Sequence, residues 1–147
     1  MTYAEIEDAA LTLLAPLKAD HGVRTLESYG GEFSPDSFGQ VTVNYPAVYV
    51  CIPSLDSEKA NQDDKRHAIV EVYAASRNLR GEAAARRGDS QNSGAYALIE
   101  AARAKLNRQT LPGAGQLILK RERLVGYSKV LSLCVMKAEF ELSFRSN

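Results

Sequence analysis

Residues 130–144 constrain the fold of this chain more than any other segment, because their side chains alternate in character. The residues expected to face inward are Ala138, Phe140, Leu142 and Phe144. The residues expected to face outward are Lys137, Glu139, Glu141 and, just beyond, Arg145. A period of two is typical of a β-strand with one buried face, so the chain must build a sheet with a covered side.

The first half of the same stretch has a different pattern. Leu131, Leu133 and Val135 occupy the face that later becomes polar. This half of the strand is therefore expected to be covered on both sides. The cover is either one of the chain's own helices or, as the sharper alternative, a neighbouring subunit. Under the second alternative these three side chains are candidate interface residues.

The remaining periodicities predict one α+β domain spanning residues 1–147. Helices are expected at residues 2–17, where Thr2 and Glu5 have capping-box spacing, and at 95–107, with Asn92 or Ser93 as the cap. Strands are expected at 23–29, 47–52, 67–75 (half-buried), 117–125 and 130–144, and residues 54–66 are expected to form a solvated connection. The order α-β-β-β-α-β-β predicts a mainly antiparallel sheet of about four to five strands packed by two helices.

Charge and cysteine content limit the function classes. Eighteen acidic residues balance eighteen basic ones, whereas a general affinity for nucleic acid or membranes needs a net basic field. No apolar run approaches the roughly 20 residues of a membrane span, and the acidic start of the chain does not resemble a signal peptide. Cys51 and Cys134 lie in apolar strand-like runs, which favours free buried thiols over a disulfide.

Residues 77–94 (RNLRGEAAARRGDSQNSG) form the one marked basic cluster. A connection this long inside a compact chain is usually functional or disordered. It is either a solvated connection or a segment that becomes ordered on contact with a partner subunit or an anionic surface, a task that suits the planar guanidinium group. The candidate contact residues are Arg77, Arg80, Arg86 and Arg87. The 82–87 portion favours a helix.

A second candidate contact loop lies at residues 30–40. It contains two glycines in succession, a proline and two aromatic side chains, Phe33 and Phe38, that are expected to be exposed.

The sequence contains no recognisable catalytic constellation. His21 follows a helix end, where contact with terminal carbonyls is expected. A metal site at His67 with Asp63 and Asp64 would lack a second histidine or a nearby cysteine. The cysteines have no adjacent base, and the glycines of residues 77–94 lack the lysine of a phosphate-binding loop. We therefore expect neither an enzyme nor a cofactor or metal.

Four segments resemble a known family: IED at residues 6–8, YPAVYV at 45–50, RNLRGEAAARRG at 77–88 and GAYALIE at 94–100. Their order and approximate spacing span most of the chain. On these segments the chain resembles the Mu-like phage tail-terminator family, a group of Mu-like prophage proteins.

The resemblance implies a small subunit with a tail-terminator-like fold. Such proteins form a hexameric ring that caps the finished tail tube, stops its polymerisation and presents a surface to the head. The implied partners are copies of the chain itself, tail tube and sheath proteins, a head-completion or connector protein and, transiently, DNA in the lumen, without a membrane. The implied location is the tail neck of the virion, after assembly in the host cytoplasm.

Two alternatives remain open at this point. One is another head–tail connector or completion subunit with the same sheet-and-helix body. The other is a nucleic-acid-binding module that would use the four loop arginines with Lys120, Arg121 and Arg123, and whose binding would weaken steeply with salt.

Overall fold

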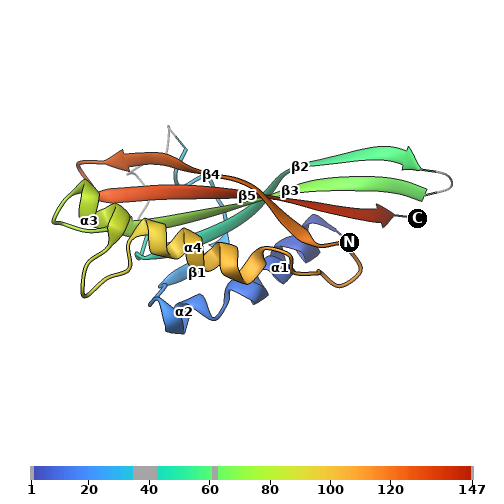
Figure 1. The fold of residues 1–147 in the computed structure, drawn as a ribbon. Helices are drawn as coiled ribbons and strands as arrows, with labels where there is room; N and C mark the ends of the chain where they lie inside the picture. Colours follow the sequence, from blue (N-terminus) through green and yellow to red (C-terminus); the bar gives the residue numbers. More distant parts are fainter. Residues whose placement is uncertain (1, 35–42, 61–62, 147) are drawn as a thin grey trace.

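The computed structural model describes residues 2–34, 43–60 and 63–146 (Figure 1). In chain order the elements are α1 (Tyr3–Leu14), α2 (Leu17–Asp20), β1 (Thr25–Ser28), β2 (Ala47–Ala60), β3 (Asp63–Arg77), α3 (Glu82–Arg87), α4 (Ala95–Leu106), β4 (Leu117–Ser128) and β5 (Leu133–Ser146). With the short α2 and α3 set aside, this is the predicted order α-β-β-β-α-β-β. The predicted α+β class is confirmed.

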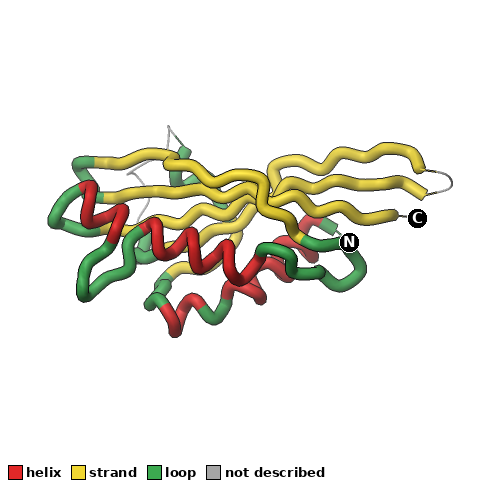
Figure 2. Tube along the Cα trace, in the orientation of Figure 1, coloured by secondary structure: helices red, strands yellow, loops and turns green. Residues whose placement is uncertain are grey.

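The strands form one mixed sheet in the order β1-β2-β3-β5-β4. β1 is parallel to β2, and the other three pairs are antiparallel. α1 and α4 lie side by side under one face of this sheet, and none of the described helices crosses the opposite face (Figures 1 and 2). β3 is central, paired on one side with β2 and on the other with β5.

The helix-covered face holds the main core, because alternate side chains of the strands meet the apolar stripes of α1 and α4. The predicted inward set of the last strand is buried as expected: Ala138, Phe140, Leu142 and Phe144. The buried residues that α1 and α4 contribute to this core are Ile6, Ala10, Leu14, Leu98, Ile99, Ala102 and Leu106.

The start of α1 follows the predicted capping box. The amide of Glu5 donates to the Thr2 hydroxyl at 3.2 Å, and the Glu5 carboxylate accepts from the Thr2 amide at 2.8 Å. α1 ends at Leu14, earlier than predicted, because Pro16 interrupts the helix and starts the single turn of α2. Gly22, with φ of +64°, turns the chain out of α2 towards β1.

The predicted solvated connection at residues 54–66 is wrong. β2 and β3 continue through it and pair as a long hairpin, with an irregularity between Cys51 and Ser54. The hairpin and the end of β5 extend beyond the helices as an arm (Figure 1). No described helix covers the arm, and most side chains of its strands are polar. The arm is therefore held mainly by the hydrogen bonds between its strands, and the apolar pattern on which the prediction relied is missing there.

Two local predictions also need correction. The cap of α4 is Gly94, and neither Asn92 nor Ser93 caps it with a side chain. β4 continues past residue 125, where the strand was expected to end, to Ser128. Gly126 instead lies at a register shift between β4 and β5.

Candidate functional site

A cleft of about 940 Å³ opens at the end of the sheet where β3 stops and residues 77–94 begin. The strand register brings three distant segments to this end of the sheet, since Thr25, Ala47 and Ala75 lie in one row across β1, β2 and β3. The residues just outside this row therefore line the cleft, and the amide of Arg24 donates to the carbonyl of Pro46 at 2.9 Å.

Residues 77–94 form one wall of the cleft, and the carboxylate of Asp89 stabilises the conformation of this segment. Its carboxylate accepts hydrogen bonds of 2.9 Å from the Asn78 side chain and from the amides of Gln91 and Asn92. These hydrogen bonds, the one from Asn78 first, hold the pKa of the Asp89 carboxyl below its usual range. Asn78 in turn accepts from the Arg80 amide at 3.0 Å. The segment is thus folded around its own carboxylate.

The far part of the segment is fixed by a close backbone contact. A Cβ atom on Gly88 would lie 2.6 Å from the amide nitrogen of Gly94, and Gly88 has a φ of +80°. Glycine is therefore the residue that fits at position 88 on both steric and conformational grounds. Between the two glycines, the Ser93 carbonyl accepts from the Ser76 hydroxyl at 2.9 Å, and the Ser93 hydroxyl lies 3.1 Å from Nδ1 of His21.

The four predicted arginines separate into two pairs. Arg77 and Arg80 line the cleft together with Arg24, which the sequence analysis missed. Arg86 and Arg87 lie on α3 and do not line it; Arg86 pairs with Glu82 at 3.3 Å and lies over the ring of Tyr96. Arg24 could be recognised only from the pairing of the strands in the folded chain, because the other arginines that line the cleft are more than 20 residues away from it in the sequence.

The guanidinium groups at the cleft are largely unneutralised. Within the described part of the chain, Arg24 and Arg77 are exposed and form no ion pair. Arg80 reaches only 3.9 Å from Asp89, with 73% of its side chain exposed. Three cations thus surround a polar cleft whose carboxylates are Asp20 and the already hydrogen-bonded Asp89. The chemistry is that of an anion-binding surface.

Two apolar side chains are strongly exposed at the same end of the molecule. Leu79, which lines the cleft, is 81% exposed, and Val130 in the β4–β5 turn is 93% exposed. The two turns touch, since the amide of Asn78 donates to the carbonyl of Ser132 at 2.9 Å. Leu79 is the one large apolar residue of residues 77–94, and that could have singled it out in the sequence.

The second apolar surface predicted from the sequence is covered by the chain itself. Leu133 and Val135 are buried, and Leu131 packs against them, in a cluster with Phe33, Tyr49 and neighbouring residues. The described side chains that cover it from the loop after β1 include Tyr29, Phe33 and Tyr45, and none of the covering residues comes from a helix. Phe33 was expected to be exposed, and this is wrong, because its ring lies 5.5 Å from that of Tyr49 and it is 6% exposed. Phe38 lies outside the described residues.

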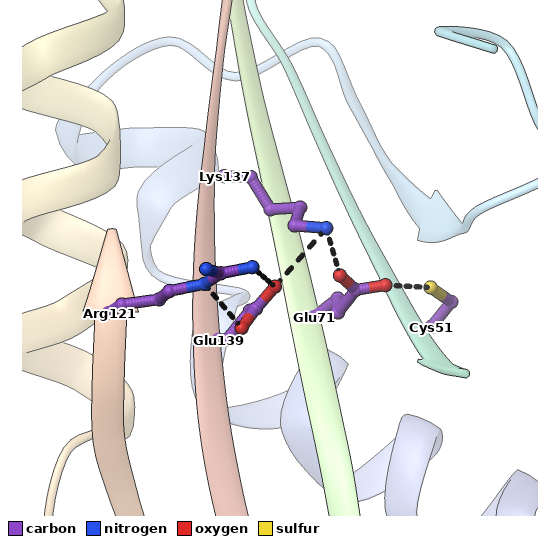
Figure 3. A network of polar contacts seen from close by, with 5 residues as sticks. All are labelled: Cys51, Glu71, Arg121, Lys137 and Glu139. Atoms are coloured by element: carbon purple, nitrogen blue, oxygen red, sulfur yellow. Dashed lines mark hydrogen bonds and ion pairs between the residues drawn. The ribbon is translucent and has the colours of Figure 1, made fainter. Parts of the chain in front are cut away.

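Beside that aromatic cluster, four neighbouring strands contribute one row of polar side chains (Figure 3). Lys137 forms ion pairs with Glu71 and, at 3.3 Å, with Glu139. Arg121 binds Glu139 with two hydrogen bonds of 2.9 and 3.2 Å, and the thiol of Cys51 lies 3.9 Å from Glu71. The predicted outward direction of Lys137 is correct, yet Lys137 is only 7% exposed and Glu71 only 8%.

Several other side chains that the sequence analysis considered have structural partners. His67 bonds the Ser143 hydroxyl at 2.9 Å, and no group of three metal-ligating side chains occurs among the described residues. Of the further basic residues considered for nucleic acid, Lys120 pairs with Glu141 and Arg121 with Glu139.

Both cysteines are free, and burial raises the pKa of the Cys51 thiol to about 12. No described helix is both long and apolar enough to span a membrane.

Comparison with known proteins adds the family. The family model described as "Bacteriophage Mu, Gp37" matches residues 2–145. The chain belongs to the bacteriophage Mu Gp37 family. This membership confirms the predicted relation to Mu-like phages, while the description of the Gp37 family does not name a tail-terminator role. Curated protein sequences give no match.

Among solved structures, the chain is similar to one from the structure titled "Virion of native gene transfer agent (GTA) particle". The TM-score is 0.62 at 13% sequence identity, and the match covers 96% of this chain and 95% of the other. The two chains therefore share one fold along almost their full length.

Proposed function

We propose that the chain is a phage structural protein that acts as a tail terminator. Copies of it form a ring, hexameric as the family resemblance implies, that caps the tail tube, stops its polymerisation and offers the surface to which the head is joined. The observation that carries the proposal is the fold shared over 96% of this chain with a chain of a gene transfer agent virion. Membership of a phage Mu family supports it.

The surface of the subunit suits assembly. A closed ring needs contacts between two different patches of each subunit, repeated by rotation. One end of the molecule presents exposed Leu79 and Val130 beside the exposed arginines of the cleft. Exposed apolar side chains beside arginine are typical of protein contacts. The proposed partners are other copies, tail tube and sheath proteins and a head-completion protein. The proposed location is the tail neck, after assembly in the host cytoplasm.

The test is deletion of the gene from a phage or inducible prophage that encodes it. We expect tails of abnormal length that do not join heads, and a plasmid copy should restore both properties. Negative-stain microscopy of the purified chain, alone or with tail tubes, should show rings. Tails of normal length that still join heads would refute the proposal.

Tail length also separates the terminator from the other head–tail connector role. Loss of a connector that acts after termination leaves tails of normal length without heads. Binding to nucleic acid is a weaker alternative, because Lys120 and Arg121 are engaged in ion pairs. A gel shift at low salt would still detect contact between cleft arginines and DNA in the lumen.

A further inference from the structure

The net charge of the chain is zero, but charges of one sign gather locally in two places. The segment that precedes Lys18 contains three acidic residues and no basic one: Glu5, Glu7 and Asp8. Beside them Tyr3 is 51% exposed. Neither Glu7 nor Asp8 forms an ion pair within the described part of the chain. The start of α1 is therefore an acidic surface with an aromatic side chain.

The cleft has the complementary character. It presents Arg24, Arg77 and Arg80, with exposed Leu79 on its lining and Val130 close by. Phosphate binding alone would make no use of the two apolar side chains, whereas a protein segment with carboxylates and an exposed aromatic ring would use both. The occupant that fits is an acidic helical segment with an apolar anchor.

The start of α1 cannot fill the cleft of its own subunit. α1 runs from the acidic end towards α2, and the turn after α2 lines the cleft through His21 and Arg24 (Figure 1). A helix of 12 residues spans about 18 Å, so α1 itself keeps the two surfaces apart. Contact between them requires a second copy.

We propose that the cleft receives the acidic start of α1 from a neighbouring copy of the chain. Guanidinium groups of Arg24, Arg77 and Arg80 would bind the carboxylates of Glu7 and Asp8, and Tyr3 would pack near Leu79. This inference rests on the proposed self-assembly and names the surfaces that carry it. Since one surface lies at each end of α1, the contact is head-to-tail, the type that closes into a ring.

The experiment exchanges charges between the two surfaces. One variant carries Arg77→Glu and Arg80→Glu, and the other carries Glu7→Lys and Asp8→Lys. Arg123→Glu on β4 and Glu100→Lys on α4 serve as matched controls, because both residues are exposed and lie away from the cleft lining. Circular dichroism and thermal unfolding establish that each variant folds, and sedimentation velocity measures association.

Each variant alone should associate about 100-fold more weakly than the wild type, because it places like charges together at every contact. An equimolar mixture should associate again, since each cleft then meets a start of α1 of opposite charge. The control variants should associate as the wild type does. Restoration in the mixture is a result that a folding defect could not produce.

Other outcomes overturn the inference. Unchanged association of the two variants, or no restoration on mixing, would mean that other surfaces join the copies. A wild type that stays monomeric at all concentrations and on tail tubes would also refute it. If the cleft variant loses binding to duplex DNA while it associates normally, the cleft is a DNA surface. Tail length in the gene deletion decides the proposed function independently of all these results.

Discussion

On the face that α1 and α4 cover, the sheet contributes alternating apolar side chains such as Val70, Val72 and Phe140, all fully buried. At the same level, the opposite face carries Glu71, Lys137 and Glu139, joined by ion pairs. Both faces contain buried side chains, but on the helix-covered face these are apolar groups that need no polar partner. The other requires each charge to have a defined partner.

The difference between the two faces indicates how the register between β3 and β5 is fixed. Glu71 lies directly opposite Glu139, and Tyr73 opposite Lys137. A shift of β5 by one residue would turn Lys137 and Glu139 towards the main apolar core and would separate Lys137 from Glu71. The helix-covered face contributes most of the buried apolar side chains. The ion pairs of the opposite face make a shifted pairing of β3 with β5 unfavourable.

The largest effect should follow from a change on the helix-covered face. Phe140→Ala removes a ring with 0% exposure from the main core and should lower the free energy of unfolding by about 3–5 kcal/mol. Urea unfolding followed by circular dichroism measures this change. A loss of less than 1 kcal/mol, on the order of a surface substitution, would mean that this face does not dominate stability.

Lys137→Ala should have the next largest effect, about 3 kcal/mol, because it leaves two neighbouring carboxylates without their shared cation. The double variant Lys137→Met with Glu71→Gln should recover most of that loss, since no buried charge is left unpaired at Glu71. Exposed Lys129→Ala is the control and should change little. Equal losses in the single and double variants would contradict the role of the ion pair.

Tyr73→Leu probes the junction between the aromatic cluster and the polar row. It removes the stacked contact with Tyr29, whose ring centroid lies 4.2 Å away, and the contact of the Lys137 ammonium with the Tyr73 ring. The expected loss in unfolding free energy is about 1 kcal/mol. Tyr96→Leu on α4, where the ring is 41% exposed, is the matched control and should cost less.

Arg121→Ala should have the smallest effect at neutral pH, below about 1 kcal/mol, because the Arg121 side chain is 62% exposed. This effect should depend on pH and should fade in acid. The Arg121 guanidinium, followed by Lys137, holds the pKa of the Glu139 carboxyl below its usual range. That stabilisation is present above the unfolded pKa of about 4.3 and is lost as the pH falls through the folded pKa.

In Arg121→Ala the folded pKa of Glu139 lies closer to the unfolded value, so less stability remains to be lost in acid. The difference in melting temperature between wild type and variant should therefore shrink from pH 6 towards pH 3. A difference that stays constant over this range would show that the pair does not titrate.

The helix-covered face could be predicted from the sequence because burial on one side leaves a period of two, as in Ala138, Phe140 and Leu142. The capping box at Thr2 was predictable for a similar reason, since it depends on local spacing. The arm was not predictable, because its strands are held by neighbours rather than by apolar side chains. At the cleft, Arg77 and Arg80 were found as a charge cluster, whereas Arg24 joins them only through the register of β1, β2 and β3.

The same register has a mechanical consequence. β3 is one uninterrupted strand from the arm at Asp63 to the edge of the cleft at Arg77, flanked on both sides by antiparallel neighbours. A force that pulls the arm away from the cleft end acts along this strand, so its hydrogen bonds to β2 and β5 are loaded together in shear and cannot open one by one. A subunit held at these two ends would resist stretching along β3 far better than peeling of its edge strands.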